Sequence, residues 1–165
     1  MNEITLTQNK VAFVDDKDFE RVNRFKWYAQ NHGNQWYAVR NETYHHKKQR
    51  QRKVQMHRFI TGISREWWID HVNGEGLDNR RNNLRPCTNS TNQANRKTSC
   101  NKIVEYKGVY FHKKSGKYMV RIQQDGYRYF LGEYYSPIFA AEIYDKKAVE
   151  LFGEYAKTNF GGNNG

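Results

Sequence analysis

The sequence predicts a mixed α+β protein with short strands, few helices and two structured parts joined by a polar segment. Three observations predict this class. Near the N-terminus, apolar and polar residues alternate in short runs, as they do in half-buried strands. A hairpin pattern followed by a short helical pattern covers residues 67–97. Three β-rich runs and one amphipathic helical pattern then fill residues 103–160.

The N-terminal part, up to residue 62, combines short strands with two short helices. Alternation of apolar residues indicates the strands, and an aspartate before an apolar stripe indicates the first helix. The expected elements are, in order, two strands within 3–14, a helix beginning at Asp15 or Asp16, strands at 27–30 and 36–40 around a turn at 31–34, and a helix over 56–61 ended by Gly62. We treat residues 1–97 as one structural unit.

Residues 67–97 are the most informative run of the chain. Asp70 and His71 close an apolar stretch, a turn-rich loop follows, and a short Asn-Leu-Arg strand and an Asn-bearing helix complete the run. Adjacent side chains of a strand point to opposite faces, so Asp70 and His71 can serve one site only if the strand ends there. The next residues, 72–74, suit a turn because Asn and Gly accept positive φ.

The residue types in this run suit phosphodiester hydrolysis, which needs an activated water and neutralised phosphate charge. No other histidine lies between His57 and His112, so His71 is the local candidate for a general base, and its ordinary pKa of about 6.5 suits that role. Asp70 offers a hard carboxylate oxygen for an ion such as Mg²⁺. Each residue alone can equally be a turn or cap residue, and only their ordered combination favours a site.

This order of residues resembles the HNH, or ββα-metal, nuclease motif in the form found in phage and intron-encoded homing endonucleases. The resemblance implies that His71 is the general base, that Asp70 and Asn92 hold a Mg²⁺ or Mn²⁺ ion, and that Asn83 orients the His71 ring through a hydrogen bond. Many relatives carry His where this chain has Asn92, but an Asn carbonyl oxygen also binds Mg²⁺. The matching pieces are 56–58, 70–74, 77–80, 83–85, Thr88, Asn92 and Asn95.

The charge of the chain favours a polyanionic partner. Lys and Arg number 28 against 17 Asp and Glu, which gives a net charge of +11. The densest basic run, residues 45–53, is either a solvated loop or an arm that follows phosphates. Within the nuclease-like part we expect Arg58, Arg80 and Arg85 to contact double-stranded DNA.

The sequence predicts a polar linker at residues 98–102 and a flexible tail at residues 161–165. Between them, residues 103–160 are expected to form a three-stranded antiparallel sheet packed on one helix. The strands are expected at 106–111, 118–123 and 127–131, with turn signals at 114–116 and 124–126. Ser136-Pro137 begins the helix, an apolar stripe from Ala141 to Leu151 marks its buried face, and Gly153 ends it.

This second part resembles the APETALA or ethylene-response-factor DNA-binding domain. The ordered set that carries the resemblance is 106–109, 116–118, 130–132, 140–145 and Asn159-Phe160. The resemblance implies that the sheet enters the major groove of DNA, and the residues that would face DNA are Lys107, Tyr110, His112, Arg121, Gln123, Arg128 and Phe130. The plant pattern differs at three of these positions, so no base preference is implied. Any single aromatic residue here can instead serve cross-strand packing.

Composition argues against several other classes of protein. The two cysteines, Cys87 and Cys100, form no Cys-x-x-Cys pair, so a zinc ribbon is not expected. The sequence has no apolar run of about 18 residues and no signal-type N-terminus. We therefore expect a cytoplasmic protein, in a bacterial host cell if a phage encodes it, without a membrane partner or a small-molecule cofactor.

Taken together, these patterns predict a metal-dependent, site-preferring DNA endonuclease of the homing type. Residues 1–97 would cut, and residues 103–160 would position the cut, since a short linker raises the effective concentration of the second module. A monomer with one motif has one active site and would nick one strand per binding event. The alternatives are a sequence-specific DNA-binding regulator with an inactive nuclease domain and an RNA-binding protein that uses the aromatic sheet for stacking.

Overall fold

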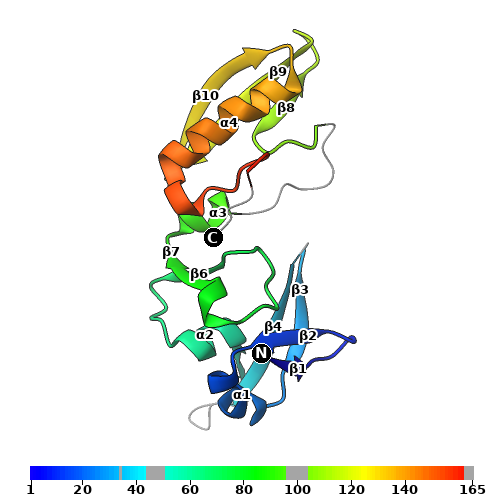
Figure 1. Cartoon of the computed structure of the whole chain (residues 1–165), viewed down its shortest axis with the longest axis vertical. Helices are drawn as coiled ribbons and strands as arrows, with labels where there is room; N and C mark the ends of the chain where they lie inside the picture. The colour runs from blue at the N-terminus through cyan, green and yellow to red at the C-terminus, as the bar shows by residue number, and fades with distance from the viewer. Residues whose placement is uncertain (34, 44–50, 96–103, 162–165) are drawn as a thin grey trace. The chain divides into compact units, whose positions relative to one another are not determined.

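Short antiparallel sheets and few helices make up the fold (Figure 1), which confirms the predicted α+β class. The computed structural model describes residues 1–33, 35–43, 51–95 and 104–161. Its chain divides into two compact units, Met1–Cys87 and Thr88–Gly165. The linker predicted at 98–102, the boundary predicted at residue 97, residues 45–50 of the basic run and residues 162–165 of the tail lie outside the described residues.

The first unit contains two two-stranded sheets, one three-stranded sheet and short helices. Its elements are β1 (Asn2–Thr5), β2 (Val11–Val14), α1 (Asp16–Asn23), β3 (Tyr28–His32), β4 (Gln35–Thr43), β5 (Gln51–Gln55), α2 (Met56–Thr61), β6 (Trp68–His71), the 3-10 turn η1 (Arg81–Asn83) and β7 (Leu84–Cys87). The sheets are β1-β2, β3-β4-β5 and β6-β7, and all pairs are antiparallel. Side chains from all three sheets and both helices enclose one apolar core.

The helix predicted over residues 56–61 is confirmed as α2, and Gly62 ends it in the left-handed conformation at φ 67°. The strand β5 was not among the predicted elements, because residues 51–53 belong to the basic run that was expected to form a loop or an arm. Pairing with β4 decides the outcome: Arg52 lies opposite Glu42 and forms an ion pair with it at 3.6 Å. Long-range pairing of this kind overrides local polarity.

The second unit is a three-stranded sheet with one long helix packed on it (Figure 1). Its elements are α3 (Asn89–Ala94), β8 (Val109–His112), β9 (Lys117–Gln124), β10 (Tyr127–Tyr134), α4 (Pro137–Phe152) and the 3-10 turn η2 (Gly153–Tyr155). Ser136 caps α4 by accepting a hydrogen bond from the Phe139 N–H at 3.2 Å. Ala94 packs in the core of this unit, so α3 belongs with the sheet that follows it in the chain.

Gly108 allows α4 to approach the sheet closely. Its backbone has φ 74°, and a Cβ added there would lie 2.0 Å from a ring carbon of the buried Tyr144. No side chain fits in that space, so the packing of α4 on the sheet requires glycine at this position. Among the described residues, no helix combines the length and the apolar character needed to span a membrane.

Candidate active site and nucleic-acid interface

The strand β6 carries both Asp70 and His71. In the register of the β6-β7 pair, Asp70 lies opposite Arg85 and His71 lies opposite Leu84, so the two side chains point to opposite faces of the ribbon. His71 is the last residue of the strand, and the Gly74 N–H donates to its carbonyl at 2.8 Å. The chain therefore turns directly after His71, as a shared site requires.

The His71 ring is buried among two other rings. The His57 ring lies 5.1 Å away, centroid to centroid, at 85°, and the Tyr37 ring lies 5.9 Å away. Burial lowers the pKa of His71 below its ordinary value, while the Asp70 carboxylate, a hydrogen-bonding interaction with Asn79 and the Asp78 charge act in the opposite direction. The lowered pKa leaves the imidazole neutral at neutral pH, the form that can accept a proton.

His57 restricts the position of the His71 ring. Burial, followed by repulsion from His71 and Arg58, lowers the pKa of His57 to about 3, so His57 also stays neutral. The Tyr37 ring lies 6.0 Å from it at 71°, which completes a group of three rings from β4, α2 and β6. Edge-to-face packing of this kind favours one relative orientation of the rings.

Arg85 fixes the orientation of the Asp70 carboxylate. Its Nε and Nη2 atoms donate to Asp70 Oδ2 at 3.1 and 3.0 Å. Both side chains are largely buried, with 6% of the Asp70 side chain and 13% of the Arg85 side chain exposed. Two charge-assisted hydrogen bonds to one carboxylate oxygen restrict the orientation of Asp70.

The loop from Val72 to Asn83 is held by amide side chains. Asn83 Oδ1 accepts from the Asn73 N–H at 2.9 Å, and Asn83 Nδ2 donates to the Asp78 carbonyl at 2.8 Å. Asn73 Nδ2 in turn donates to Asp78 Oδ2 at 2.9 Å. Asn83 thus braces the turn that follows His71, and Asn79 acts to raise the pKa of the His71 ring.

The same loop is joined to the N-terminal hairpin. The Phe13 N–H donates to the Leu77 carbonyl at 2.9 Å, and the Asn79 N–H donates to the Phe13 carbonyl at 2.8 Å. These bonds form a parallel bridge between Phe13 and Asp78. The strand β2 therefore supports the segment that lies against His71.

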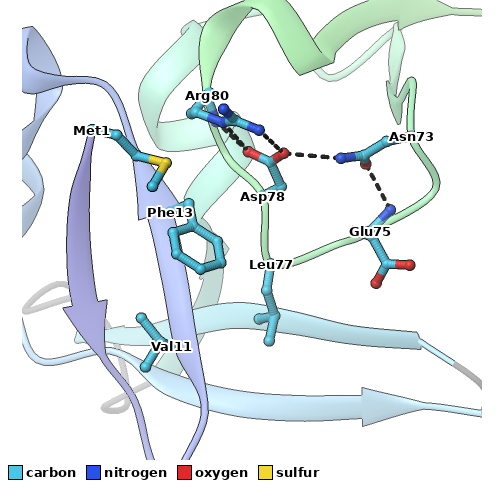
Figure 2. A pocket seen from close by; sticks show the side chains of 8 residues that line it. All are labelled: Met1, Val11, Phe13, Asn73, Glu75, Leu77, Asp78 and Arg80. Atoms are coloured by element: carbon cyan, nitrogen blue, oxygen red, sulfur yellow. Dashed lines mark hydrogen bonds and ion pairs between the residues drawn. The ribbon is translucent and has the colours of Figure 1, made fainter. Parts of the chain in front are cut away.

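A pocket of about 410 Å³ lies between the hairpin and this loop (Figure 2). Arg80 Nε donates to Asp78 Oδ1 at 2.8 Å and Arg80 Nη2 donates to Oδ2 at 2.6 Å, and Asn73 Nδ2 donates to the same Oδ2 at 2.9 Å. The hydrogen bonds from Arg80 and Asn73 hold the pKa of Asp78 below its usual range. The lining residues are Met1, Val11, Phe13, Asn73, Glu75, Leu77, Asp78 and Arg80, and thus not the Asp70-His71 pair.

In the second unit, the strand register gathers most of the predicted DNA-facing residues on one face of the sheet. Directly paired residues share a face, and the pairs on this face include Tyr110 with Met119, His112 with Lys117, Arg128 with Gln123 and Phe130 with Arg121. The opposite face carries Val109, Val120 and Ile122, which are buried in the core with α4. The described DNA-facing candidates therefore lie on the side away from α4.

Comparison with known proteins identifies the family. The chain is 31% identical over 154 residues to an uncharacterized HNH endonuclease of Acanthamoeba polyphaga mimivirus, and the match covers 90% of this chain and 74% of that protein. The chain belongs to the HNH endonuclease family. No protein-family model matches it.

Three arginines of the HNH unit that were predicted to contact DNA make bonds inside the protein. Arg85 is paired with Asp70, and Arg80 is paired with Asp78. Arg58 donates to the carbonyls of Trp67 at 2.9 Å and Ser64 at 3.5 Å. In this structure these guanidinium groups organise the loops around the site. Lys107, predicted for the sheet, donates from Nζ to the Ala94 carbonyl.

Of the two predicted metal ligands, only Asp70 lies on the strand that carries His71. Asp70 contributes a carboxylate oxygen, which is the ligand type that Mg²⁺ and Mn²⁺ prefer. Asn92, the other predicted ligand, lies on α3 in the second unit. Among residues 1–33, 35–43, 51–95 and 104–161, no three His, Cys, Asp or Glu side chains gather in a group that could hold a metal ion.

Sequence reasoning missed three residues of the HNH site. His57 and Asn79 were noted only as parts of matching motifs, and Asp78 was not assigned a role. A buried His beside an Asp-x-Arg pair is not visible as periodicity or spacing, because these contacts depend on α2 and the loop folding against β6. The sequence signal for these residues was their place in the motif pieces 56–58 and 77–80.

Proposed function

We propose that the chain is a metal-dependent DNA endonuclease of the homing type, with His71 as the general base. One observation carries the proposal: a buried imidazole with a lowered pKa ends the strand β6, directly after a carboxylate held by Arg85, in a member of the HNH endonuclease family. A neutral imidazole accepts the proton of an attacking water, which a protonated ring cannot do. His57 and Tyr37 restrict the motion of that ring, which limits the cost of aligning it.

Asp70 would contribute a carboxylate oxygen to the divalent ion. When bound, a Mg²⁺ or Mn²⁺ ion neutralises developing charge on the phosphate and on the leaving oxygen. Arg85 supports this assignment because its two hydrogen bonds fix the Asp70 carboxylate. Asn83 contributes indirectly, through the two bonds that hold the turn after His71.

The sheet β8-β9-β10 would read DNA, as the APETALA resemblance implies. Two features support this role: the candidates share the face away from α4, and several of them are exposed, including Arg121, Arg128 and Phe130. Arginine suits bidentate contact with guanine in the major groove, and aromatic side chains suit contact with thymine methyl groups. His112 is bonded to Glu133 at 3.0 Å on this face, so its imidazole has a partner in the free protein.

One His71 per chain gives one hydrolytic centre per monomer. The proposed product is therefore a nick in one strand, and cutting of both strands requires a second binding event. Site preference comes from the second unit, and the chemistry comes from the first. The net charge of +11 supports the binding of DNA by both.

Incubation with supercoiled plasmid, with and without Mg²⁺, tests the proposal. The wild-type chain should convert supercoiled DNA to the open circular form only with the metal present. His71→Ala should lower the rate by about 10²–10⁴ without weakening plasmid binding. Glu20→Ala serves as the control, because Glu20 is an exposed residue of α1 in the same unit. Metal-dependent nicking at the wild-type rate by His71→Ala would exclude His71 as the base, and an inactive wild type that binds DNA would favour a regulator.

A further inference from the structure

Two adjacent tryptophans, Trp67 and Trp68, are exposed at the start of β6. Each is 50% exposed, whereas Trp27 is only 5% exposed. Exposed indoles side by side are unusual on a soluble protein, because burial of aromatic surface is strongly favourable. Such a pair offers aromatic surface for contact with another molecule.

The strand register shows which face Trp68 occupies. Trp68 lies opposite Cys87, and Asp70 lies opposite Arg85 two positions along the same ribbon. Residues two apart on a strand share a face and lie about 7 Å apart. Trp68 therefore flanks Asp70 on the face opposite to Ile69, which is buried in the core. Trp67 precedes the strand and is not part of this alternation.

The segment before β6 is held in one conformation and carries positive charge. Arg58 donates to the Trp67 carbonyl, and the Trp67 N–H donates to the Ser64 carbonyl at 3.2 Å. Arg65 is exposed in the same turn, beside the exposed Glu66. Arg58 and Arg65 carry two positive charges and Glu66 carries one negative charge, so the turn has a net positive charge. An aromatic side chain beside guanidinium groups suits the binding of nucleic acid.

We propose that Trp68 contacts the bases of the DNA duplex beside the phosphodiester that is cut, where its indole acts as a wedge that unstacks one base step. This inference rests on the proposed function, because the contact is located by the shared face of Trp68 and Asp70. Apolar side chains inserted between base steps kink a duplex, and an aromatic ring can stack on any base. Trp68 is a positioning residue: it affects how the scissile phosphate is presented and takes no part in proton transfer.

Two measurements on the full chain test the wedge: the affinity for a DNA duplex and the unstacking of its bases. The probe is the plasmid-derived duplex that the wild-type chain binds most tightly, with 2-aminopurine placed in successive base steps. Its fluorescence rises when a step is unstacked. Wild type should raise the signal at one step, and Trp68→Ala should abolish the rise and weaken binding about 5- to 100-fold. Trp68→Phe should retain most of both.

Trp67→Ala is the matched control, since Trp67 is equally exposed but lies outside the Asp70 face. It should leave the 2-aminopurine signal at the wild-type level. Equal loss in the two alanine variants, or unchanged signal and affinity in Trp68→Ala, would overturn the proposal. Trp68→Gln repeats the comparison if Trp68→Ala does not fold. A chain that binds the duplex but never nicks plasmid contradicts the proposed function, and the fluorescence comparison still decides the wedge.

Discussion

Lowering the pH from 7 to 5 should destabilise the first unit through His57. Burial lowers the pKa of His57 from 6.5 to about 3, so the folded chain keeps this ring neutral where the unfolded chain protonates it. A group of this kind contributes nothing above pH 6.5 and destabilises the fold progressively as the pH falls from 6.5 to 3. At 1.36 kcal/mol per pH unit, the loss between pH 7 and 5 is about 2 kcal/mol.

Two other groups of this unit with shifted pKa values, Asp78 and His71, bear on the measurement. The pKa of Asp78 is lowered from 3.8, so Asp78 is ionised at both pH values and does not contribute in this window. The lowered pKa of His71 acts in the same direction as that of His57, so a single-residue comparison is needed to isolate His57. All four tryptophans lie in the first unit, so their fluorescence reports the unfolding of this unit alone.

Urea unfolding monitored by tryptophan fluorescence measures the difference. The free energy of unfolding should fall between pH 7 and 5 by about 2 kcal/mol more in the wild type than in His57→Phe. The comparison uses the change with pH, so any change in absolute stability caused by the substitution cancels. His57→Gln provides a second non-titrating variant. Equal pH dependence in wild type and both variants would refute the assignment of a buried, neutral His57.

Three further outcomes follow from the structure. The single-turnover nicking rate should be flat above pH 6.5 and fall only as the pH drops through the lowered pKa of His71; a decline that begins above 6.5 would contradict a buried base. Gly108→Ala should destabilise the second unit by on the order of 2–4 kcal/mol, because its Cβ would overlap Tyr144; calorimetry should show that transition lowered and the first-unit transition unchanged. The double substitution Arg121→Ala and Arg128→Ala should weaken binding to the preferred duplex by about 1–3 kcal/mol per lost base contact and leave nicking at saturating DNA intact. If the double variant binds both the specific and the scrambled duplex as tightly as the wild type does, the sheet does not face the DNA.

Much of the secondary structure could be predicted, because it depends on local patterns. Alternating residues near the N-terminus indicated the β1-β2 hairpin, and the helical stripe after Ser136 indicated α4. The strand β5 was missed because its residues are mostly charged and polar, and only pairing with β4 makes them a strand. A polar strand that depends on its partner carries little signal in its own sequence.

The candidate site could be predicted only in part for a related reason. The Asp70-His71 pair and the turn after it were visible in the order of residues, but the partners of those side chains were not. Arg85 was expected to contact DNA, and the pairing register brings it opposite Asp70 instead. The Asn79 contact and the His57 ring depend on a loop and a helix that are distant in sequence from β6, and no periodicity reports such contacts.

The bridge between Phe13 and the loop after His71 limits which segment of this chain can be moved into another protein with its structure intact. The loop takes two of its backbone hydrogen bonds from β2, so the segment around the proposed base is assembled from opposite ends of the first unit. A cassette of residues 56–97 moved into another protein would carry the Asp-His pair without the strand edge that supports its loop. An exchangeable piece that keeps these two hydrogen bonds must include β2 together with the motif.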